Sequence, residues 1–473
     1  MKFKNILLST LVVAGLFTSC SDEWLEESPT NALNADGAIT SVQAADLALN
    51  GAYSRMQDGD YYGGSFLLNS DVKGDDVQCF MEGRRFADEY NYTTTADFGS
   101  VDLYKEAYIV NSQAVLVLAA IGDITDGTEA QINNVKGEAL ALSALAHFDL
   151  VRTYGKTYTM DNGVGLGVPI ISKPADYTVP VVRNTVAEVY NYVITSLETA
   201  KDLLSEEKTP GRINSWAAKA LLSRVYLYKG DNVNALKLAE EVMSSSKYGL
   251  IDREGYVESW SSEFNAESLF EIINLSDDNG ADRESIGYVA KPQPDGYGAV
   301  AATDAFIARI TADPADVRGQ FIQSHEGERN GYIAKYPGTG GENYMINNVK
   351  VLRMSEVYLN AAEAAFKIGD AAHLAKSLTY LNAIYKRATD KEIVSSDLTL
   401  ERILIERRNE LVLEGHRLFD AMRNDETMVR TGGSHFTTGE AKSVNRNWNK
   451  TVMPLPQYEL DTNKSLVQNP GYN

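Results

Sequence analysis

Two stretches of the chain repeat one pattern, in which an apolar helical segment ends at Gly-Asp and a second helical segment follows. They read NSWAAKALLSRVYLYKGDNVNALKLAEEVMSSS (214–246) and LRMSEVYLNAAEAAFKIGDAAHLAKSLTYLNAIYKRA (352–388). Glycine ends a helix at low steric cost, and aspartate caps the helix that follows. The pattern therefore predicts two pairs of helices, each with a tight turn at its Gly-Asp.

These helix pairs have about 34 residues each and carry alanine and tyrosine at their seams, so they resemble tetratricopeptide units. The units are scattered rather than in tandem, and we expect insertions to interrupt the superhelix. Apolar residues at helical spacing predict further helices, at about 40–56, 101–121, 128–154, 185–204 and 398–424. The predicted fold class is mainly α, with scattered tetratricopeptide-like helix pairs that form a scaffold.

Two long regions between these helices lack a regular apolar period. Residues 57–100 are rich in Gly, Asp and aromatic residues, and residues 247–351 are rich in Gly, Asp, Tyr and Pro. Long irregular segments in a compact protein usually carry function. We expect the second region to form a loop-rich lobe with a few short strands.

The first 20 residues combine a short apolar run with a lone cysteine at its end. Two lysines are the only charges before Cys20, and residues 6–17 (ILLSTLVVAGLF) are almost wholly apolar. This run is too short for a transmembrane helix, which needs about 20 apolar residues, and it matches a secretory signal peptide. Because cleavage just before a cysteine is typical of bacterial lipoproteins, we expect a signal peptide at 1–19, followed by acylated Cys20 and a flexible tether at 20–35. An ordinary signal peptide with an incidental cysteine is the alternative.

The chain is acidic. Its formal net charge of −21 becomes −23 without residues 1–19, which carry two lysines and no acid. This balance argues against a nucleic acid as partner and disfavours electrostatic docking on anionic lipid. A neutral partner, such as an uncharged glycan, is compatible with it, although solubility alone explains the charge equally well.

No catalytic signature stands out. The chain contains no HExxH, GxSxG or Walker A motif, and no GxGxxG followed by a helix; its five histidines are dispersed. Cys79 has no histidine near it in sequence, so a small buried residue is favoured over a nucleophile. The charge run at 406–410 indicates a solvated face or a structural ion-pair network. A carboxylate pair suited to glycoside hydrolysis is never excluded by sequence, but nothing singles one out.

Metal binding has one weak candidate. Residues 277–282 (DDNGAD) loosely resemble a calcium loop, because clustered oxygen ligands with a glycine suit that ion. The spacing does not match an EF-hand, so a polar turn is favoured. We predict no cofactor and leave calcium open as the alternative.

Tyrosine is unusually abundant, with 26 Tyr against 14 Phe and 4 Trp, and several aromatic residues fall in the irregular regions. Tyrosine offers an apolar face and a hydroxyl group. This combination suits sugars, whose rings present C–H faces and hydroxyls. For any single aromatic residue, plain packing is the alternative.

An ordered set of stretches, nearly from end to end, resembles the SusD/RagB family of outer-membrane lipoproteins from Bacteroidetes. They are CSDEWLEESPTNAL, GEALALSALAHFDLVRTYG, GVPI, ALLSRVYLYKGD, ESLFEI, DVR, LRMSEVYLNAAEAAFKIGD, ERRNELVLEGHRLFDAMR, PLPQYEL and NPGY. Most of these are scaffold motifs, which identify the fold and say little about the ligand.

The resemblance implies a SusD-like fold and a non-catalytic role. Family members bind oligosaccharides or polysaccharides at the cell surface and pass them to a SusC-type TonB-dependent transporter of the outer membrane. Asp22 and Glu23 resemble the surface-export signal of these bacteria. The implied organisation is a single domain over 36–473. Its scaffold would lie at about 36–56, 101–246 and 352–424, and its ligand-facing lobe at about 57–100 and 247–351.

In the family, loops after the first helix and within the mid-chain insertion face the ligand. Aromatic rings there can stack on a sugar ring, and Asp and Arg can each bond two neighbouring hydroxyls. We therefore expect a subset of the following residues to form a shallow glycan site: Tyr61, Tyr62, Phe66, Asp71, Asp75, Asp76, Arg84, Arg85, Tyr288 and Tyr297.

Three other functions stay open on the sequence. The first is a lid for uptake of peptides or other non-sugar nutrients, since some family members serve such uptake. The second is an exported glycoside hydrolase, which would release product from a cleft holding an acid pair. The third is a helical-repeat adaptor that binds its transporter and no small ligand.

Overall fold

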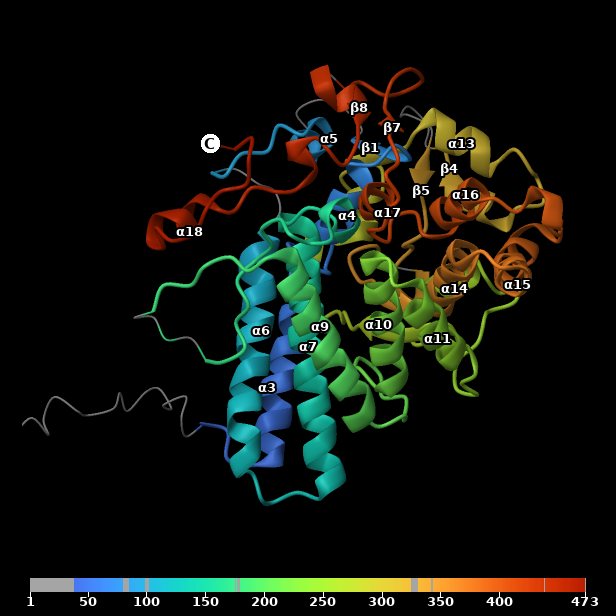
Figure 1. The fold of residues 1–473 in the computed structure, drawn as a ribbon. Coiled ribbons are helices and arrows are strands. Elements are labelled where there is room, and N and C mark those ends of the chain that lie inside the picture. Colours follow the sequence, from blue (N-terminus) through green and yellow to red (C-terminus); the bar gives the residue numbers. More distant parts are fainter. Residues whose placement is uncertain are drawn as a thin grey trace, which may run out of the picture.

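The computed structural model describes residues 38–79, 85–97, 102–174, 176, 179–324, 331–341, 343–437 and 439–472. The expected signal peptide at 1–19, Cys20 and the tether lie outside the described residues, as does Arg84. The described part is mainly helical, which confirms the predicted fold class (Figure 1).

The N-terminal half forms a sheaf of long helices that pack on one another in nearly sequential order. α3 packs on α6 and α7, and contacts then run from α6 to α7, α9, α10 and α11 (Figure 1). Their bounds are α3 Val42–Arg55, α6 Leu103–Ala120, α7 Glu129–Tyr154, α9 Val186–Leu203, α10 Ser215–Lys229 and α11 Asn232–Met243; the four-residue α8 (Tyr158–Asp161) follows α7. Each long helix lies within a few residues of its predicted range.

The second helix pair completes this array. α14 (Met354–Ile368) packs on α15 (Ala371–Thr389) and also directly on α11, although the whole 244–353 region separates α11 from α14 in sequence. The predicted insertion therefore separates the two helix pairs along the sequence, but in the folded protein the two pairs pack directly on each other. The insertion leaves the array after α11 and returns to it at α14.

Both Gly-Asp turns have the predicted conformation. Gly230 and Gly369 end their helices with φ of 85° and 87°, in the left-handed region that favours glycine. Asp231 accepts a hydrogen bond from Asn234 N, and Asp370 accepts from the backbone N–H of the second and third residues of α15. Each aspartate therefore caps the helix after the turn.

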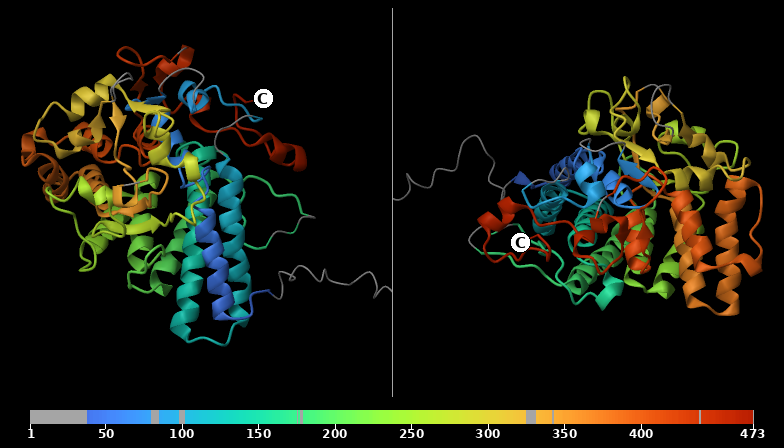
Figure 2. Two further views of the ribbon diagram at one scale, coloured as in Figure 1. Left: turned by 180° about the vertical axis from the view of Figure 1, so that it is seen from behind. Right: turned by 90° about the horizontal axis from the view of Figure 1, so that it is seen from above.

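The lobe is built from short elements. Residues 57–100 contribute α4 (Ser65–Val72), β1 (Val77–Cys79) and α5 (Ala87–Asn91). The second region contributes β2 (Ser268–Ile272), α12 (Ile286–Ala290), β3 (Val300–Ala302), α13 (Asp304–Ile310), β4 (Ile322–Gln323), β5 (Tyr332–Ile333) and β6 (Val349–Arg353). The strands form antiparallel pairs β1–β3, β2–β6 and β4–β5. Pairing of β1 with β3 joins the two lobe regions, and Figure 2 shows the yellow second region gathered on one side of the molecule.

The helix predicted over 398–424 is wrong in one respect, because it is broken in the middle. α16 (Leu400–Glu410) ends, and α17 (Arg417–Arg423) starts after a turn in which Leu413 and Gly415 have φ of 60° and 77°. Side chains from the lobe donate hydrogen bonds to the backbone carbonyl groups of this turn. Lys335 Nζ donates to Glu410 O and Val412 O, and Tyr336 OH donates to Leu413 O. Tertiary hydrogen bonds thus replace the helical ones.

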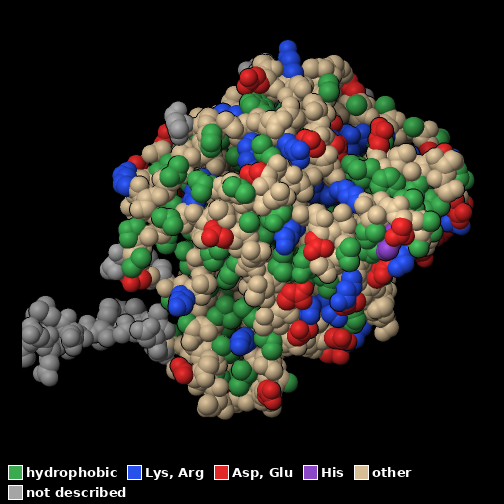
Figure 3. Space-filling view, viewed as in Figure 1, with side chains coloured by type: hydrophobic (Ala, Val, Ile, Leu, Met, Phe, Trp, Pro, Cys, Tyr) green, Lys and Arg blue, Asp and Glu red, His purple; other side chains and the backbone are tan. Residues whose placement is uncertain are grey.

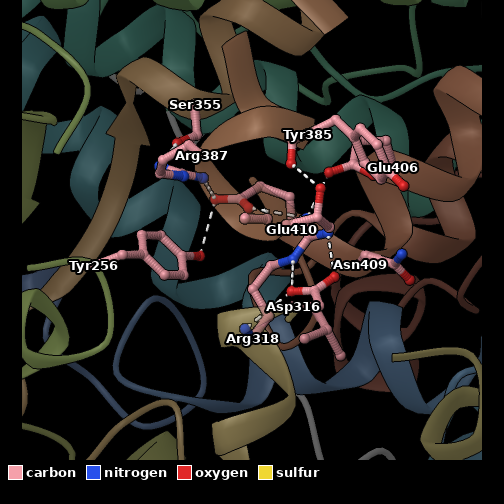
Figure 4. A network of polar contacts seen from close by, with 12 residues as sticks. Tyr256, Asp316, Arg318, Ser355, Tyr385, Arg387, Glu406, Asn409 and Glu410 are labelled. Carbon is pink, nitrogen blue, oxygen red and sulfur yellow. Dashed lines mark hydrogen bonds and ion pairs between the residues drawn. The ribbon is translucent and has the colours of Figure 1, made fainter. Parts of the chain in front are cut away.

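A buried network of ion pairs ties the lobe to α16 (Figure 4). Arg318 Nη1 lies 2.6 Å from Glu406 Oε1, and Arg353 Nη1 lies 2.7 Å from Glu410 Oε1. Arg387 of α15 also pairs with Glu410. Burial opposes the charge of Glu410, but the surrounding arginines hold its pKa well below the usual value. The charge run seen in the sequence is therefore a structural network and not a solvated face.

The chain ends on small elements that follow α17. β7 (Met428–Val429) pairs with β8 (Ser443–Val444), and α18 (Gln457–Thr462) lies near the C-terminal end (Figure 1).

Cys79 is buried, as predicted. On the face seen in Figure 3, acidic and basic side chains are interspersed. Within the described residues, no helix is both long and apolar enough to cross a membrane.

Candidate functional site

Three of the predicted site residues meet on the surface of the lobe. The ring centroids of Tyr288 and Tyr297 lie 4.9 Å apart, with an interplanar angle of 86°. The Arg85 guanidinium lies over the Tyr297 ring, 4.3 Å from its centroid, and forms an ion pair with Glu284. The Arg85 side chain is 45% exposed and the Glu284 side chain 35% exposed. We call these four residues the tyrosine–arginine cluster.

The backbone around α12 fixes the two tyrosines. Ser285 caps α12 and accepts from Tyr288 N, while its hydroxyl donates to Tyr344 O at 3.0 Å. Tyr297 N donates to Tyr288 O at 2.9 Å, so the turn after α12 folds back on it. A Cβ at Gly287 would lie 2.6 Å from Tyr344 O, which explains the glycine at this close approach.

Arg85 reaches the cluster from the other lobe region. The Cys79 thiol, at the end of β1, donates to Arg85 O at 3.1 Å. Because β1 pairs with β3, the segment that carries Arg85 lies beside the one that carries the tyrosines. Arg85 Nη2 also donates to the Tyr297 hydroxyl at 3.4 Å. The cluster is therefore assembled from segments about 200 residues apart in sequence.

The chemistry of this cluster suits a ring with apolar faces and hydroxyl groups. Tyrosine rings present apolar faces with polar edges. The ion pair adds donors on Arg85 and acceptors on Glu284, so a hydroxyl group, which both donates and accepts, finds both kinds of partner. Both tyrosines are half-buried, which leaves part of each ring open to a ligand.

A second aromatic–cation contact adjoins the cluster. Lys291, three residues after Tyr288, donates from Nζ to the Tyr344 hydroxyl at 2.9 Å and lies 4.2 Å from that ring's centroid. Neither residue was singled out from the sequence, and Glu284 was also missed. The only feature of the sequence that pointed to Lys291, Tyr344 and Glu284 was their position in the predicted lobe.

Comparison with known proteins identifies the family. A SusD superfamily protein from Bacteroides vulgatus ATCC 8482, of known crystal structure, is 38% identical to this chain with a TM-score of 0.86; the match covers 92% of this chain and all of that one. This chain belongs to the SusD family. The SusD family model matches residues 323–472, and a model described as starch-binding and associating with the outer membrane matches residues 23–227.

Further SusD relatives match along the whole chain. SusD-like protein P2 of Formosa agariphila is 26% identical, over 99% of this chain and 98% of the relative. A laminarin-binding SusD-like protein of known structure is 23% identical with a TM-score of 0.73, over 92% of this chain and all of that one. At that identity, the likeness shows the shared fold. The model that matches residues 23–227 describes the family as starch-binding.

In this SusD-family protein, the other aromatic residues predicted for the site lie in the core. Tyr61, Tyr62 and Phe66 are each at most 1% exposed. The two tyrosine hydroxyls donate to Asp149 Oδ2 at 2.7 and 2.9 Å. These side chains present no surface to a ligand, so their expected stacking on a sugar is corrected to packing. The sequence did not reveal that a buried carboxylate of α7 takes both hydroxyls.

The three predicted aspartates are engaged within the protein. Asp71 is buried and accepts from Gly415 N at 2.8 Å. Asp75 pairs with Arg417 at 2.6 Å, and Asp76 pairs with Arg408 at 2.6 Å.

Burial opposes the charge of Asp76, but Arg408 and Arg309 hold its pKa well below the usual value. The predicted bonds from the three aspartates to sugar hydroxyls are therefore corrected to internal contacts. Of the ten predicted residues, Arg84 lies outside the described part.

The calcium candidate forms a turn. Leu275 N donates to Asp278 O, and Asn279 Oδ1 accepts from the backbone of Ala281 and Asp282. This is the polar turn that the sequence favoured. Across the described residues, no group of three or more His, Cys, Asp or Glu side chains is placed to hold a metal ion.

Proposed function

We propose that this SusD-family protein binds an oligosaccharide or polysaccharide through the tyrosine–arginine cluster. The observation that carries the proposal is the perpendicular tyrosine pair beside the exposed Arg85–Glu284 ion pair. Membership of a starch- and glycan-binding family supports it, as does the laminarin-binding relative of the same fold.

We further propose that the protein acts without catalysis and passes its ligand to a SusC-type TonB-dependent transporter. In this proposal, Cys20 carries the lipid anchor that holds the chain on the outside of the outer membrane. The lipoprotein-like leader and the family description of outer-membrane association support this arrangement. A lid for peptide or other non-sugar nutrients is the alternative.

Calorimetric titration of residues 21–473 against plant, microbial and host polysaccharides tests the binding function. All described elements begin after residue 37, so this form keeps the whole described fold and lacks the lipidated cysteine. We expect saturable heat with at least one glycan and no new reducing ends. New reducing ends would identify a hydrolase, and silence across the panel would favour a non-sugar nutrient.

Two variants assign the binding to the cluster. The double variant Tyr288→Ala/Tyr297→Ala is expected to weaken the glycan affinity by about tenfold or more, because each stacked ring contributes about 1 kcal/mol. Tyr458→Ala, which removes an exposed tyrosine of α18, is the matched control and should leave the affinity unchanged. Equal affinities of the double variant and the control would move the site elsewhere.

A further inference from the structure

We propose that the tyrosine–arginine cluster selects uncharged glycan chains over chains that carry uronic acids. This inference rests on the proposed glycan-binding function and concerns the charge balance of the same site. Its basis is the pairing of the cluster's cation, Arg85, with a carboxylate of the protein itself.

Arg85 is held by two neighbours on the protein. Its Nη1 pairs with Glu284, while its Nη2 donates to the Tyr297 hydroxyl and its plane lies over the same ring. A uronate carboxylate would have to displace Glu284 or approach beside it, against the repulsion of two like charges. A neutral hydroxyl can instead use the remaining donors of Arg85 and the acceptors of Glu284 without breaking the pair.

The segment that carries Glu284 and both tyrosines is itself acidic. Residues 277–297 contain five acidic residues (Asp277, Asp278, Asp282, Glu284 and Asp295) and two basic ones (Arg283 and Lys291). Together with Arg85, this part of the lobe therefore carries a net negative charge. Lys291 is already in contact with the Tyr344 hydroxyl and ring. A polyanionic chain lying across the cluster would meet a repulsive local field, which salt screens.

A comparison of two variants isolates the role of the ion pair. Glu284→Gln keeps the shape of the side chain and frees the charge of Arg85. Glu254→Gln changes the net charge equally at an exposed residue outside the cluster and is the matched control. In Arg85→Gln/Glu284→Gln both charges are lost, so the net charge of the protein is unchanged.

Binding of soluble starch, laminarin and polygalacturonate to residues 21–473 is measured by calorimetry at low and high salt. The unmodified protein should bind a neutral glucan with little dependence on salt, and polygalacturonate at least about tenfold more weakly. Glu284→Gln should strengthen polygalacturonate binding by about fivefold at low salt, an effect lost at high salt. The control and the double variant should show no such gain.

Two results would overturn the inference while leaving the glycan function standing. The first is polygalacturonate binding by the unmodified protein as tight as that of the glucans. The second is a Glu284→Gln protein, folded by circular dichroism, whose polygalacturonate affinity matches that of Glu254→Gln. If no glycan of either class binds, or if Tyr288→Ala/Tyr297→Ala binds as before, the proposed function of the cluster fails and the inference fails with it.

Discussion

Arg224 and Glu356 form a buried, two-pronged ion pair between α10 and α14. Arg224 Nε lies 2.6 Å from Glu356 Oε1, Nη2 contacts the second carboxylate oxygen, and each side chain is 3% exposed. Nη2 also donates to Val351 O of β6 at 2.7 Å. This ion pair therefore joins the first Gly-Asp helix pair (α10 and α11) to the second (α14 and α15), which follows the insertion in sequence.

We expect Arg224→Ala to lower the free energy of unfolding by about 3–5 kcal/mol, because it leaves the Glu356 carboxylate buried without its partner. The double variant Arg224→Met/Glu356→Leu should lose much less, since no charge is left unpaired. Lys386→Ala, which breaks the exposed pair with Glu392, is the control and should leave the stability nearly unchanged. Urea titration measures all three; equal losses for the single and double variants would contradict the expectation.

His147 should make the protein less stable in mild acid. Its Nδ1 donates to Ser143 O at 2.8 Å, while Nε2 accepts from Ile171 N at 3.2 Å, so the neutral ring satisfies both bonds. Burial lowers the pKa of His147 to about 4. The unfolded chain, with a histidine pKa near 6.5, therefore binds the proton first, and stability is lost as the pH falls from about 6.5 to 4.

The loss from this one group should reach about 3 kcal/mol at pH 4. Comparing the unmodified protein with His147→Asn by urea titration at several pH values isolates it, because other titrating groups contribute to both. The stability difference between the two proteins should shrink as the pH falls. A difference independent of pH would show that His147 does not titrate in this way.

Two glycines should respond to alanine in opposite directions. Gly369 has φ of 87°, so Gly369→Ala should destabilise the protein by about 1–2 kcal/mol. Gly51 lies inside α3 with no atom within 4 Å of a Cβ built on it, so Gly51→Ala should stabilise by about 0.5–1 kcal/mol. Thermal unfolding measures both shifts, and a shared sign would contradict the assigned backbone conformations.

Tyr61 and Tyr62 should matter for stability but not for the ligand. Replacing either with phenylalanine removes one hydroxyl from Asp149 and should cost about 1–2 kcal/mol of unfolding free energy. The affinity for any glycan bound by the unmodified protein should stay unchanged. A clear loss of glycan affinity without a loss of stability would show that these tyrosines belong to the binding site.

The scaffold could be predicted because its signals are local. Gly230-Asp231 and Gly369-Asp370 determine where helices stop and start through the conformation and hydrogen bonds of a few adjacent residues. The break after Glu410 could not be predicted in the same way. It depends on Lys335 and Tyr336, which reach the carbonyl groups from a distant segment.

The site was predicted less well for a related reason. Composition placed aromatic and charged residues in the lobe, but burial depends on partners far away in sequence. The Tyr61 hydroxyl donates to Asp149 and the side chain is buried in the core, whereas Tyr297 contacts Arg85 and is only half-buried. The same residue type in the same kind of loop therefore takes either role, and only the tertiary contacts decide which.

The direct packing of α11 on α14 has a consequence for the order in which the chain acquires its structure. During synthesis, the helices up to α11 are complete once residue 243 has been added, but the surface of α11 that α14 covers stays open until residue 368 has followed. Contacts so distant in sequence form slowly, because a long loop must close first. The growing polypeptide therefore carries an uncovered apolar helix face while more than a hundred further residues are added, and this interval is when it is most exposed to aggregation.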